Sequence, residues 1–212
     1  MQSLDTNHWI FNFMKSYRKG NYLEIGPGDS NLLKTFRKFG WHCEGLELQK
    51  IYKVKGVHTN INKISIKNKD VLVFHDVLEH VADPLSVLKK FSKQQKSGSK
   101  LFLAYPNSSS HKARILKTKW NMVAPLAHLN FFSVESTKIL LKSCGYYPYS
   151  IKQTSLVIFK KILRSIIRLP ITFTLDIVNF RILCAFKRIP EIILNILDLI
   201  KGDQMHVIAI KE

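Results

Sequence analysis

The stretch NYLEIGPGDSN, residues 21–31, decides the fold class. A short apolar run that contains one acid, Glu24, leads directly into two glycines, Gly26 and Gly28. A turn of this kind between a strand and a helix brings backbone N–H groups and a helix amino terminus toward a ligand, and glycine lets the ligand come close to the backbone. A dinucleotide site would have a third glycine where this chain has Asn31. The stretch therefore predicts a ligand-binding turn of an α/β fold, but not a dinucleotide site.

Short apolar runs alternate with helical patterns after this turn. Strands are expected at 22–25, 42–48, 55–58, 71–75 and 101–105, and helices near 30–39 and 84–95. Such alternation predicts parallel strands joined by helices. The runs VLVF and LFLA are apolar at every position, as expected of strands that helices cover on both faces. We expect a doubly wound α/β domain.

The second half of the chain begins with PNSSS at 106–110 and a basic loop region. A helix is expected from Ser133, its cap, to Cys144, with Gly145 as its stop. Strand-like segments follow at 146–152 and 205–210. We therefore assign 1–155 and 202–212 to one domain that is interrupted by an insert.

The expected insert, residues 156–201, is amphipathic and basic. Apolar residues recur at helical spacing, as in Phe159, Ile162 and Ile166, while Lys160 and Arg164 fall on the other face. Basic side chains beside an apolar face are typical of an interfacial helix on an anionic membrane. A helical cap packed on the sheet or on a second subunit is an equal alternative, because apolar stripes usually belong to a core.

The composition narrows the class of partner. The chain has 212 residues, 46% of them apolar, and 33 Lys and Arg against 15 Asp and Glu give a formal charge of +18. This charge favours an anionic partner such as nucleic acid, an acidic membrane or a phosphorylated substrate. Three distant cysteines predict neither a disulfide framework nor a cysteine-based zinc site. With no signal peptide or run of about 20 apolar residues visible, we expect a cytoplasmic protein, peripheral on the inner membrane face if the insert binds lipid.

Several motifs together resemble those of the class I S-adenosylmethionine-dependent methyltransferases. The first motif of that family, an apolar strand with an acid followed by G-x-G and a small residue, is matched by Glu24, Gly26, Gly28 and Ser30. The segment VLVFHDVLEHVADP, then LFLAYPN and HLNFF, extends the likeness over about 21–153, and 205–211 matches the final strand. The likeness is greatest to the ubiquinone-biosynthesis O-methyltransferases and the small methyltransferases of glycan and lipid pathways. It implies a Rossmann-like, seven-stranded, mostly parallel sheet.

The resemblance also implies which residues bind the cofactor. The acid of the first motif helps to bind the methionine portion, and the glycines give the nucleoside room. Glu47 follows Gly26 by 21 residues, close to the offset of about 20 at which an acid accepts hydrogen bonds from ribose hydroxyls. Asn60 replaces the usual acid near the adenine, and its amide oxygen can still accept a hydrogen bond. The expected cofactor contacts are Glu24, Gly26, Gly28, Glu47, Leu48, Asn60, Ile61 and His75.

Histidines are the candidate bases, because methyl transfer to a hydroxyl requires removal of a proton and histidine titrates near neutral pH. By resemblance His75 lines the cofactor and His128 begins a loop that faces the acceptor, so these two are the expected catalytic residues. A buried histidine that anchors the following helix is the alternative for His128.

The segment DVLEH also has metal-binding spacing. Asp76, Glu79 and His80 stand at i, i+3 and i+4, which on a helical turn places three ligands together. The ubiquinone O-methyltransferases carry a similar pattern, associated there with a divalent ion. We favour the alternative, in which Glu79 and His80 hold neighbouring loops, because no further ligand is visible.

Three functions are compatible with these sequence patterns. The leading hypothesis is methylation of a small or lipid-linked acceptor at a hydroxyl, since no Asn-Pro-Pro-aromatic signature of amino methylation is present. The second is an RNA methyltransferase, which the charge supports and the absence of an aromatic RNA-binding motif weakens. The third is a cofactor-binding interaction module without catalysis. A homo-oligomer is compatible with all three.

Overall fold

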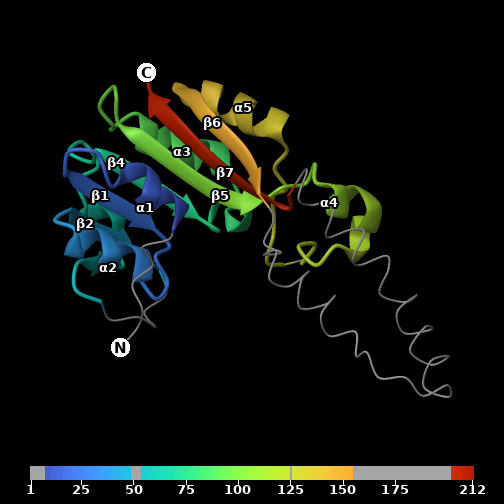
Figure 1. The fold of residues 1–212 in the computed structure, drawn as a ribbon, viewed down its shortest axis with the longest axis horizontal. Coiled ribbons are helices and arrows are strands. Elements are labelled where there is room, and N and C mark those ends of the chain that lie inside the picture. The colour runs from blue at the N-terminus through green and yellow to red at the C-terminus, as the bar shows by residue number, and fades with distance from the viewer. Residues whose placement is uncertain (1–7, 49–53, 125, 155–201) are drawn as a thin grey trace, which may run out of the picture.

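The computed structural model describes residues 8–48, 54–124, 126–154 and 202–212, which build a seven-stranded sheet (Figure 1). Its strand order is β3-β2-β1-β4-β5-β7-β6, with β7 antiparallel to both neighbours and the other pairs parallel. The expected mostly parallel Rossmann-like sheet is confirmed. The strands are β1 (Asn21–Ile25), β2 (His42–Leu46), β3 (Val57–His58), β4 (Val71–His75), β5 (Lys100–Pro106), β6 (Tyr146–Thr154) and β7 (Gln204–Lys211).

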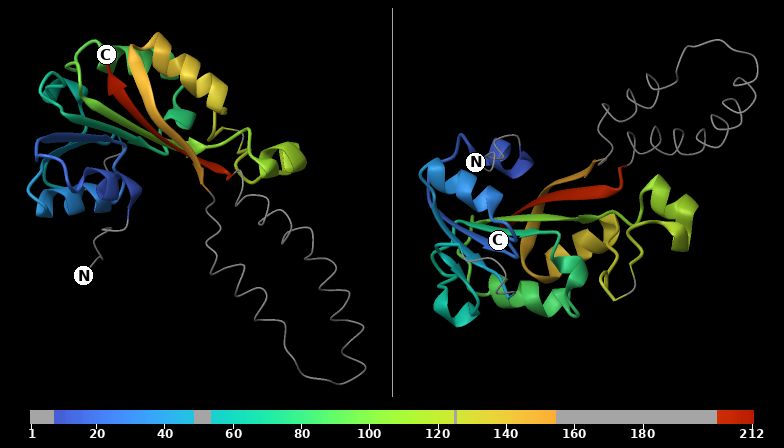
Figure 2. Two further views of the ribbon diagram at one scale, coloured as in Figure 1. Left: turned by 45° about the horizontal axis from the view of Figure 1, so that its top comes forward. Right: turned by 90° about the horizontal axis from the view of Figure 1, so that it is seen from below.

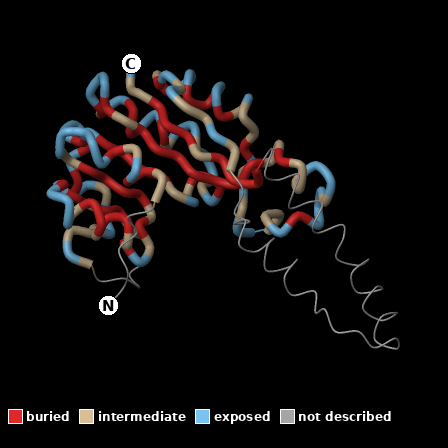
Figure 3. Tube along the Cα trace, viewed as in Figure 1, coloured by how far each residue is buried: buried red, intermediate tan, exposed pale blue. Residues whose placement is uncertain are grey.

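Helices cover both faces of the sheet, as the apolar strands require (Figure 2). The α1 (Trp9–Met14) and α2 (Asn31–Lys38) helices pack on one face, in a buried cluster with Tyr22, Val73 and Phe102. The α3 (Pro84–Ser92) and α5 (Val134–Ser143) helices pack on the other, with Leu23 and Leu72. Successive residues of a strand therefore pack into different clusters on opposite faces of the sheet. Figure 3 shows the central strands buried along their length.

The helix ends follow from local sequence. Asp83 caps α3 by accepting a hydrogen bond from the Ser86 N–H at 2.9 Å, and Pro84 occupies the first turn. Ser133 and Ser136 form a reciprocal capping box at the start of α5, and Gly145 follows its end with φ +67°. The expected cap and stop of this helix are confirmed.

Two short helices were not expected from the sequence. The first is α1, whose amino end is capped by the His8 ring. The second is α4 (His111–Leu116), which with the 3-10 turn η3 (Lys117–Lys119) replaces part of the expected basic loop. Ser110 starts α4 by accepting a hydrogen bond from the Ala113 N–H at 3.1 Å. Figure 1 shows α4 beyond the carboxyl end of β5, away from the covered sheet.

The expected insert at 156–201 lies outside the described residues. Its flanks are ordered by the sheet, because Thr154 of β6 and Gln204 of β7 are register partners. Asn107 fixes the second flank through hydrogen bonds to the backbone of Gly202 and Asp203. In the part of the chain that the structure describes, no helix has the length and apolarity needed to cross a membrane.

Candidate functional site

The turn after β1 presents open backbone at the carboxyl edge of the sheet. Gly26 and Gly28 have φ of +67° and +49°, and Ser30 follows at +61° before α2 begins. The Gly26 N–H donates to the Leu46 carbonyl at 2.8 Å, which ties the turn to β2. A Cβ built on Gly28 would meet no atom within 4 Å. The backbone at Gly28 is therefore uncovered, and a ligand can approach it as closely as the sequence predicts.

Glu24 lies under this turn in a buried pair with Tyr22. The Tyr22 hydroxyl donates to Glu24 Oε2 at 3.0 Å, and the Glu24 side chain is only 5% exposed. Burial raises the pKa of Glu24 to about 8, and the Tyr22 hydrogen bond offsets part of that rise. A cationic group beside this carboxyl would favour its ionised form.

Glu47 and Leu48 reach the same edge from the end of β2. The Gly28 N–H donates to Glu47 Oε2 at 3.3 Å, so this carboxylate lies beside the glycine turn. Leu48 is 77% exposed and offers an apolar surface next to it. The structure brings together the acid and the glycines that the sequence singles out, although they come from different strands.

Asn60 and Ile61 stand one strand further along, at the 3-10 turn η1 (Ile61–Lys63). Asn60 Oδ1 caps η1 by accepting a hydrogen bond from the Asn62 N–H at 2.9 Å. Ile61 is half-buried against the core. An amide oxygen has two lone pairs, so the cap leaves Asn60 able to accept a second hydrogen bond.

His75 ends β4 and lies in a group of aromatic rings. Its ring centroid is 5.1 Å from that of His8, and the register of the strands puts His75, Ala104 and His206 in one row across β4, β5 and β7. Trp9 stacks on His206 with centroids 4.4 Å apart and planes at 8°. Burial, together with His75 and His8, lowers the pKa of His206 to about 4. Sequence reasoning missed His206, because only strand register reveals its neighbour.

Asp76 pairs with His75 and lies apart from Glu79 and His80, with which it was considered as a metal ligand. Its Oδ2 lies 3.5 Å from His75 Nδ1, and its backbone has φ +52°. The positive φ breaks the chain direction after β4, so Asp76 is not on a helical turn with Glu79 and His80, which form the 3-10 turn η2 (Leu78–His80). Among the described residues, the group that could hold a metal combines Glu79 and His80 with His128. Asp76 is not in this group, so the less favoured reading of DVLEH as a set of three metal ligands does not have its three members together in this structure.

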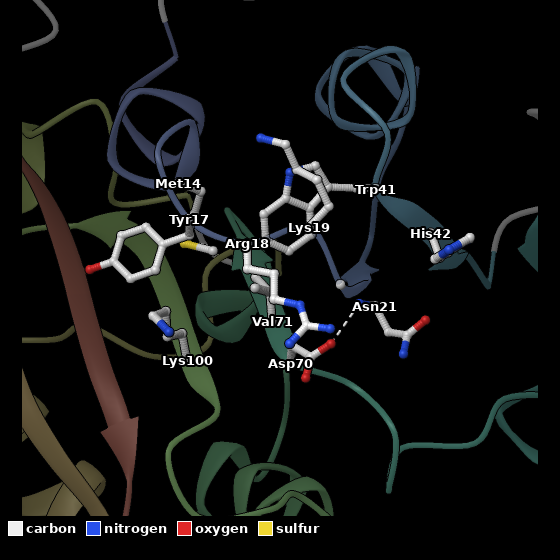
Figure 4. Close-up of a pocket in the computed structure, with 11 residues that line it drawn as sticks. Met14, Tyr17, Arg18, Lys19, Asn21, Trp41, His42, Asp70, Val71 and Lys100 are labelled. Carbon is white, nitrogen blue, oxygen red and sulfur yellow. Dashed lines mark hydrogen bonds between the residues drawn. The ribbon is translucent and has the colours of Figure 1, made fainter.

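A separate cavity of about 520 Å³ opens at the opposite, amino edge of the sheet (Figure 4). Arg18, Lys19 and Lys100 line it together with Asp70, which accepts a hydrogen bond from the Asn21 N–H at 2.7 Å. Ligands of open α/β sheets bind at the carboxyl ends of the strands. The candidate site is therefore the carboxyl edge of the sheet, at Gly26 and Gly28, and not this cavity.

A known protein family matches this chain in sequence, and several solved structures share its fold. The profile of the methyltransferase domain family matches residues 10–151, which include the glycine turn, Glu47 and the LEH segment. The chain belongs to this family. The methyltransferase uses S-adenosylmethionine, and its open Gly28 backbone with the Glu47 carboxylate beside it fits an adenosyl ligand. No curated protein sequence matches it significantly.

Solved structures share the fold of the methyltransferase at low identity. A SAM-dependent methyltransferase from Archaeoglobus fulgidus is 17% identical with a TM-score of 0.62, over 95% of this chain and 90% of that one. One from Methanosarcina mazei is 16% identical with a TM-score of 0.58, over 96% and 97%. A Haemonchus contortus phosphoethanolamine N-methyltransferase in complex with S-adenosyl-L-methionine is 12% identical with a TM-score of 0.58, over 95% and 51%.

Proposed function

We propose that this methyltransferase transfers the methyl group of S-adenosylmethionine to a hydroxyl of a small or lipid-linked acceptor, an intermediate of glycan or lipid synthesis. The cofactor supplies an activated methyl group on sulfur, so the protein has to align the acceptor and take up its proton. The observation that carries the proposal is a basic surface with exposed apolar side chains near the carboxyl edge of the sheet.

That surface is the lobe of residues 111–132, formed by α4, η3 and the following loop. It contains Lys112, Arg114, Lys117 and Lys119 and no Asp or Glu. Lys112 is engaged with Asp203 at 3.4 Å. Four large apolar side chains of the lobe are exposed: Ile115 at 54%, Leu126 at 99%, Leu129 at 54% and Phe131 at 44%.

Apolar side chains among cations suit the interface of an anionic bilayer, where the former enter the acyl boundary and the latter meet headgroups. Three of these four side chains are aliphatic and cannot stack on bases, whereas RNA binding depends on phosphate contacts and aromatic stacking. The lobe therefore supports a lipid or lipid-linked acceptor over RNA. A cytoplasmic location on the inner membrane face, with the insert at 156–201 as a second contact, is part of the same proposal.

The His75–Asp76 pair supports a hydroxyl acceptor. A carboxylate beside an imidazole holds the ring in one orientation, which is what a base for a weakly acidic hydroxyl needs. A neutral amine has a free lone pair and does not need a base to remove a proton before it attacks the methyl group. The likeness to ubiquinone-biosynthesis O-methyltransferases belongs to this proposal as well.

Vesicle sedimentation with the full-length protein tests the lobe. We expect binding to phosphatidylglycerol vesicles that exceeds binding to phosphatidylcholine, and a loss of at least about tenfold on combining Leu126→Ser and Phe131→Ser with Lys117→Glu. The matched control, outside the lobe, combines Ile139→Ser and Tyr147→Ser with Lys138→Glu, since Ile139 is 66% and Tyr147 58% exposed. Equal loss in both variants, or preferential binding of RNA over vesicles, would count against the proposal.

Transfer of a labelled methyl group from S-adenosylmethionine shows which class of acceptor the enzyme uses. A catechol and an alkyl glycoside are tested as hydroxyl acceptors, and phosphoethanolamine is tested as an amine acceptor. We expect label on the hydroxyl acceptors and a loss of turnover in His75→Gln. Methylation of the amine alone would refute the oxygen assignment, and cofactor binding without turnover would support the non-catalytic alternative.

A further inference from the structure

The cavity of about 520 Å³ at the amino edge of the sheet is lined by more positive than negative charge (Figure 4). It lies at the starts of four neighbouring strands, β2, β1, β4 and β5. Among the described residues that line it, Arg18, Lys19 and Lys100 are cations and Asp70 is the one carboxylate. Hollows lined mainly by one sign of charge concentrate the electrostatic potential and attract ligands of the opposite sign. This amino-edge cavity therefore favours an anion.

The three cations of the amino-edge cavity have no carboxylate partner within the described ranges. None of Arg18, Lys19 and Lys100 takes part in a salt bridge between described residues. Lys100 Nζ lies 4.6 Å from the centroid of the Tyr17 ring, and Lys19 Nζ lies 5.9 Å from that of Trp41. Aromatic faces attract these ammonium groups but carry no net charge. The positive charge of the cavity is therefore largely uncompensated.

Trp41 provides a second, independent observation. It lines the cavity and is 3% exposed, and its indole Nε1 is buried without a hydrogen-bond partner in the part of the chain that the structure describes. A buried N–H group without an acceptor costs free energy, which a partner recovers. An oxygen of a bound anion that reaches the indole would accept this hydrogen bond.

A second cavity, of about 450 Å³, extends the positive surface along this edge. Trp41 and His42 line both cavities, so the two adjoin. The second cavity adds Arg37 and Lys55, and the one carboxylate among its described lining residues, Glu44, is already in a salt bridge. Together the two hollows carry five Lys or Arg side chains against two acids. An anion that approaches this edge thus meets a positive potential before it enters either cavity.

The shape of the amino-edge cavity favours a small ligand over a macromolecule or a membrane. Its volume falls in the range of about 300–1,000 Å³ that is usual for small-molecule sites. Tyr17 is the one large apolar side chain of its described lining that is exposed, and the Tyr17 ring already contacts Phe13 and Lys100. The cavity therefore offers no apolar group for insertion into a bilayer and no free aromatic surface for a row of stacked bases.

We propose that the amino-edge cavity binds a phosphorylated small molecule, a nucleotide or a sugar phosphate, and that Arg18, Lys19 and Lys100 hold its phosphate group. A guanidinium group can donate two parallel hydrogen bonds to phosphate oxygens, and two ammonium groups beside it suit the charge of a phosphate monoester. The glycine turn already provides the ligand site that an open α/β sheet has at its carboxyl edge. The phosphorylated ligand is therefore additional to the methyl donor and the methyl acceptor, and this inference does not depend on the proposed function.

Calorimetry tests the site on full-length protein saturated with S-adenosylhomocysteine, which occupies the methyl-donor site. The probes are uridine monophosphate and glucose 6-phosphate, each compared with its unphosphorylated counterpart, uridine or glucose. We expect at least one of the two phosphate esters to bind once per chain, and neither counterpart to bind. Arg18→Gln combined with Lys100→Gln should weaken this binding at least about tenfold. The matched control combines Lys138→Gln with Lys142→Gln, which removes the same charge from α5, a helix that does not line the cavity, and should retain binding.

Tryptophan fluorescence locates the ligand. Glucose 6-phosphate does not absorb where tryptophan does, so it is the probe for this measurement. Its binding should change the fluorescence of the wild type and of Trp120→Phe, but not that of Trp41→Phe. A change that persists in Trp41→Phe would place the ligand elsewhere and overturn the assignment.

Binding of S-adenosylmethionine separates the possible failures. The variant with Arg18→Gln and Lys100→Gln should bind the cofactor as the wild type does, which shows that it is folded. The proposal is overturned if neither phosphate ester binds the wild type at millimolar concentration, if both charge variants lose binding equally, or if single-stranded RNA binds this cavity more tightly than the phosphate esters do. Binding of a phosphate ester by a protein that methylates only amines would keep the site and refute the proposed function.

Discussion

The hydroxyl of Tyr22 lies 3.0 Å from Glu24 Oε2 inside the protein, so the acid of the first motif is held by a hydrogen bond in a nearly dry environment. Burial raises the pKa of Glu24 to about 8. A buried acid with a raised pKa lowers the free energy of unfolding at neutral pH, because the unfolded chain ionises the same group near its ordinary pKa and is stabilised by doing so. Such a cost is typical of functional sites.

Glu24→Gln should therefore stabilise the protein while weakening cofactor binding. The unfolded state loses the proton near pH 4.5 and the folded state near pH 8, so the wild type loses stability as the pH rises between these values. The variant escapes this loss, which amounts to up to about 3 kcal/mol at pH 7. Urea unfolding at pH 4.5 and pH 7 measures the difference, and calorimetry should show at least about tenfold weaker S-adenosylmethionine binding. A variant less stable than the wild type at pH 7 would contradict this account.

Gly28→Ala should reduce cofactor affinity at least tenfold, because its Cβ would project into the open space beside the turn. The positive φ of +49° should also cost about 1 kcal/mol of stability. Gly98→Ala is the matched control, because Gly98 has φ +82° and no atom within 4 Å of a built Cβ. It should show similar strain in thermal unfolding and unchanged binding. Equal affinity loss in both variants would remove Gly28 from the cofactor site.

Glu47→Ala should weaken binding of S-adenosylmethionine by about 10-fold, the effect of losing a hydrogen bond to a charged group. The loss should be much smaller for an analogue that lacks the ribose hydroxyls, since those are the expected partners of the carboxylate. Calorimetry with two ligands and two proteins completes a double-mutant cycle. Additive losses in the cycle would show that Glu47 acts on the glycine turn and not on the ribose.

His206→Phe should make the protein less sensitive to acid. The pKa of His206 is lowered to about 4, while the unfolded chain binds the proton near pH 6.5. Stability is therefore lost as the pH falls from about 6.5 to 4, and phenylalanine removes that loss while keeping a ring against Trp9. Unfolding free energies at pH 7.5, 6 and 5 should diverge between variant and wild type only below pH 6.5. Parallel curves would mean that His206 does not contribute.

The sequence was most informative where one local pattern decides the structure. The glycine turn, the apolar strands and the cap at Ser133 are each specified within about ten residues, and the structure confirms them. The antiparallel place of β7 and the row that joins His75 to His206 depend on register between distant segments. Spacing within DVLEH could not reveal that the backbone turns at Asp76, nor that a loop returns His128 to the same point.

The pairing of Thr154 with Gln204 has a consequence for how this enzyme can be altered. Because the two strands leave the sheet as direct neighbours, a tight reverse turn could join them in place of everything between, and closing the shorter connection would even reduce the entropy lost on folding. The connection between β6 and β7 is thus a suitable insertion site. A fluorescent protein or an affinity tag inserted there would leave the strand pairing of the sheet unchanged.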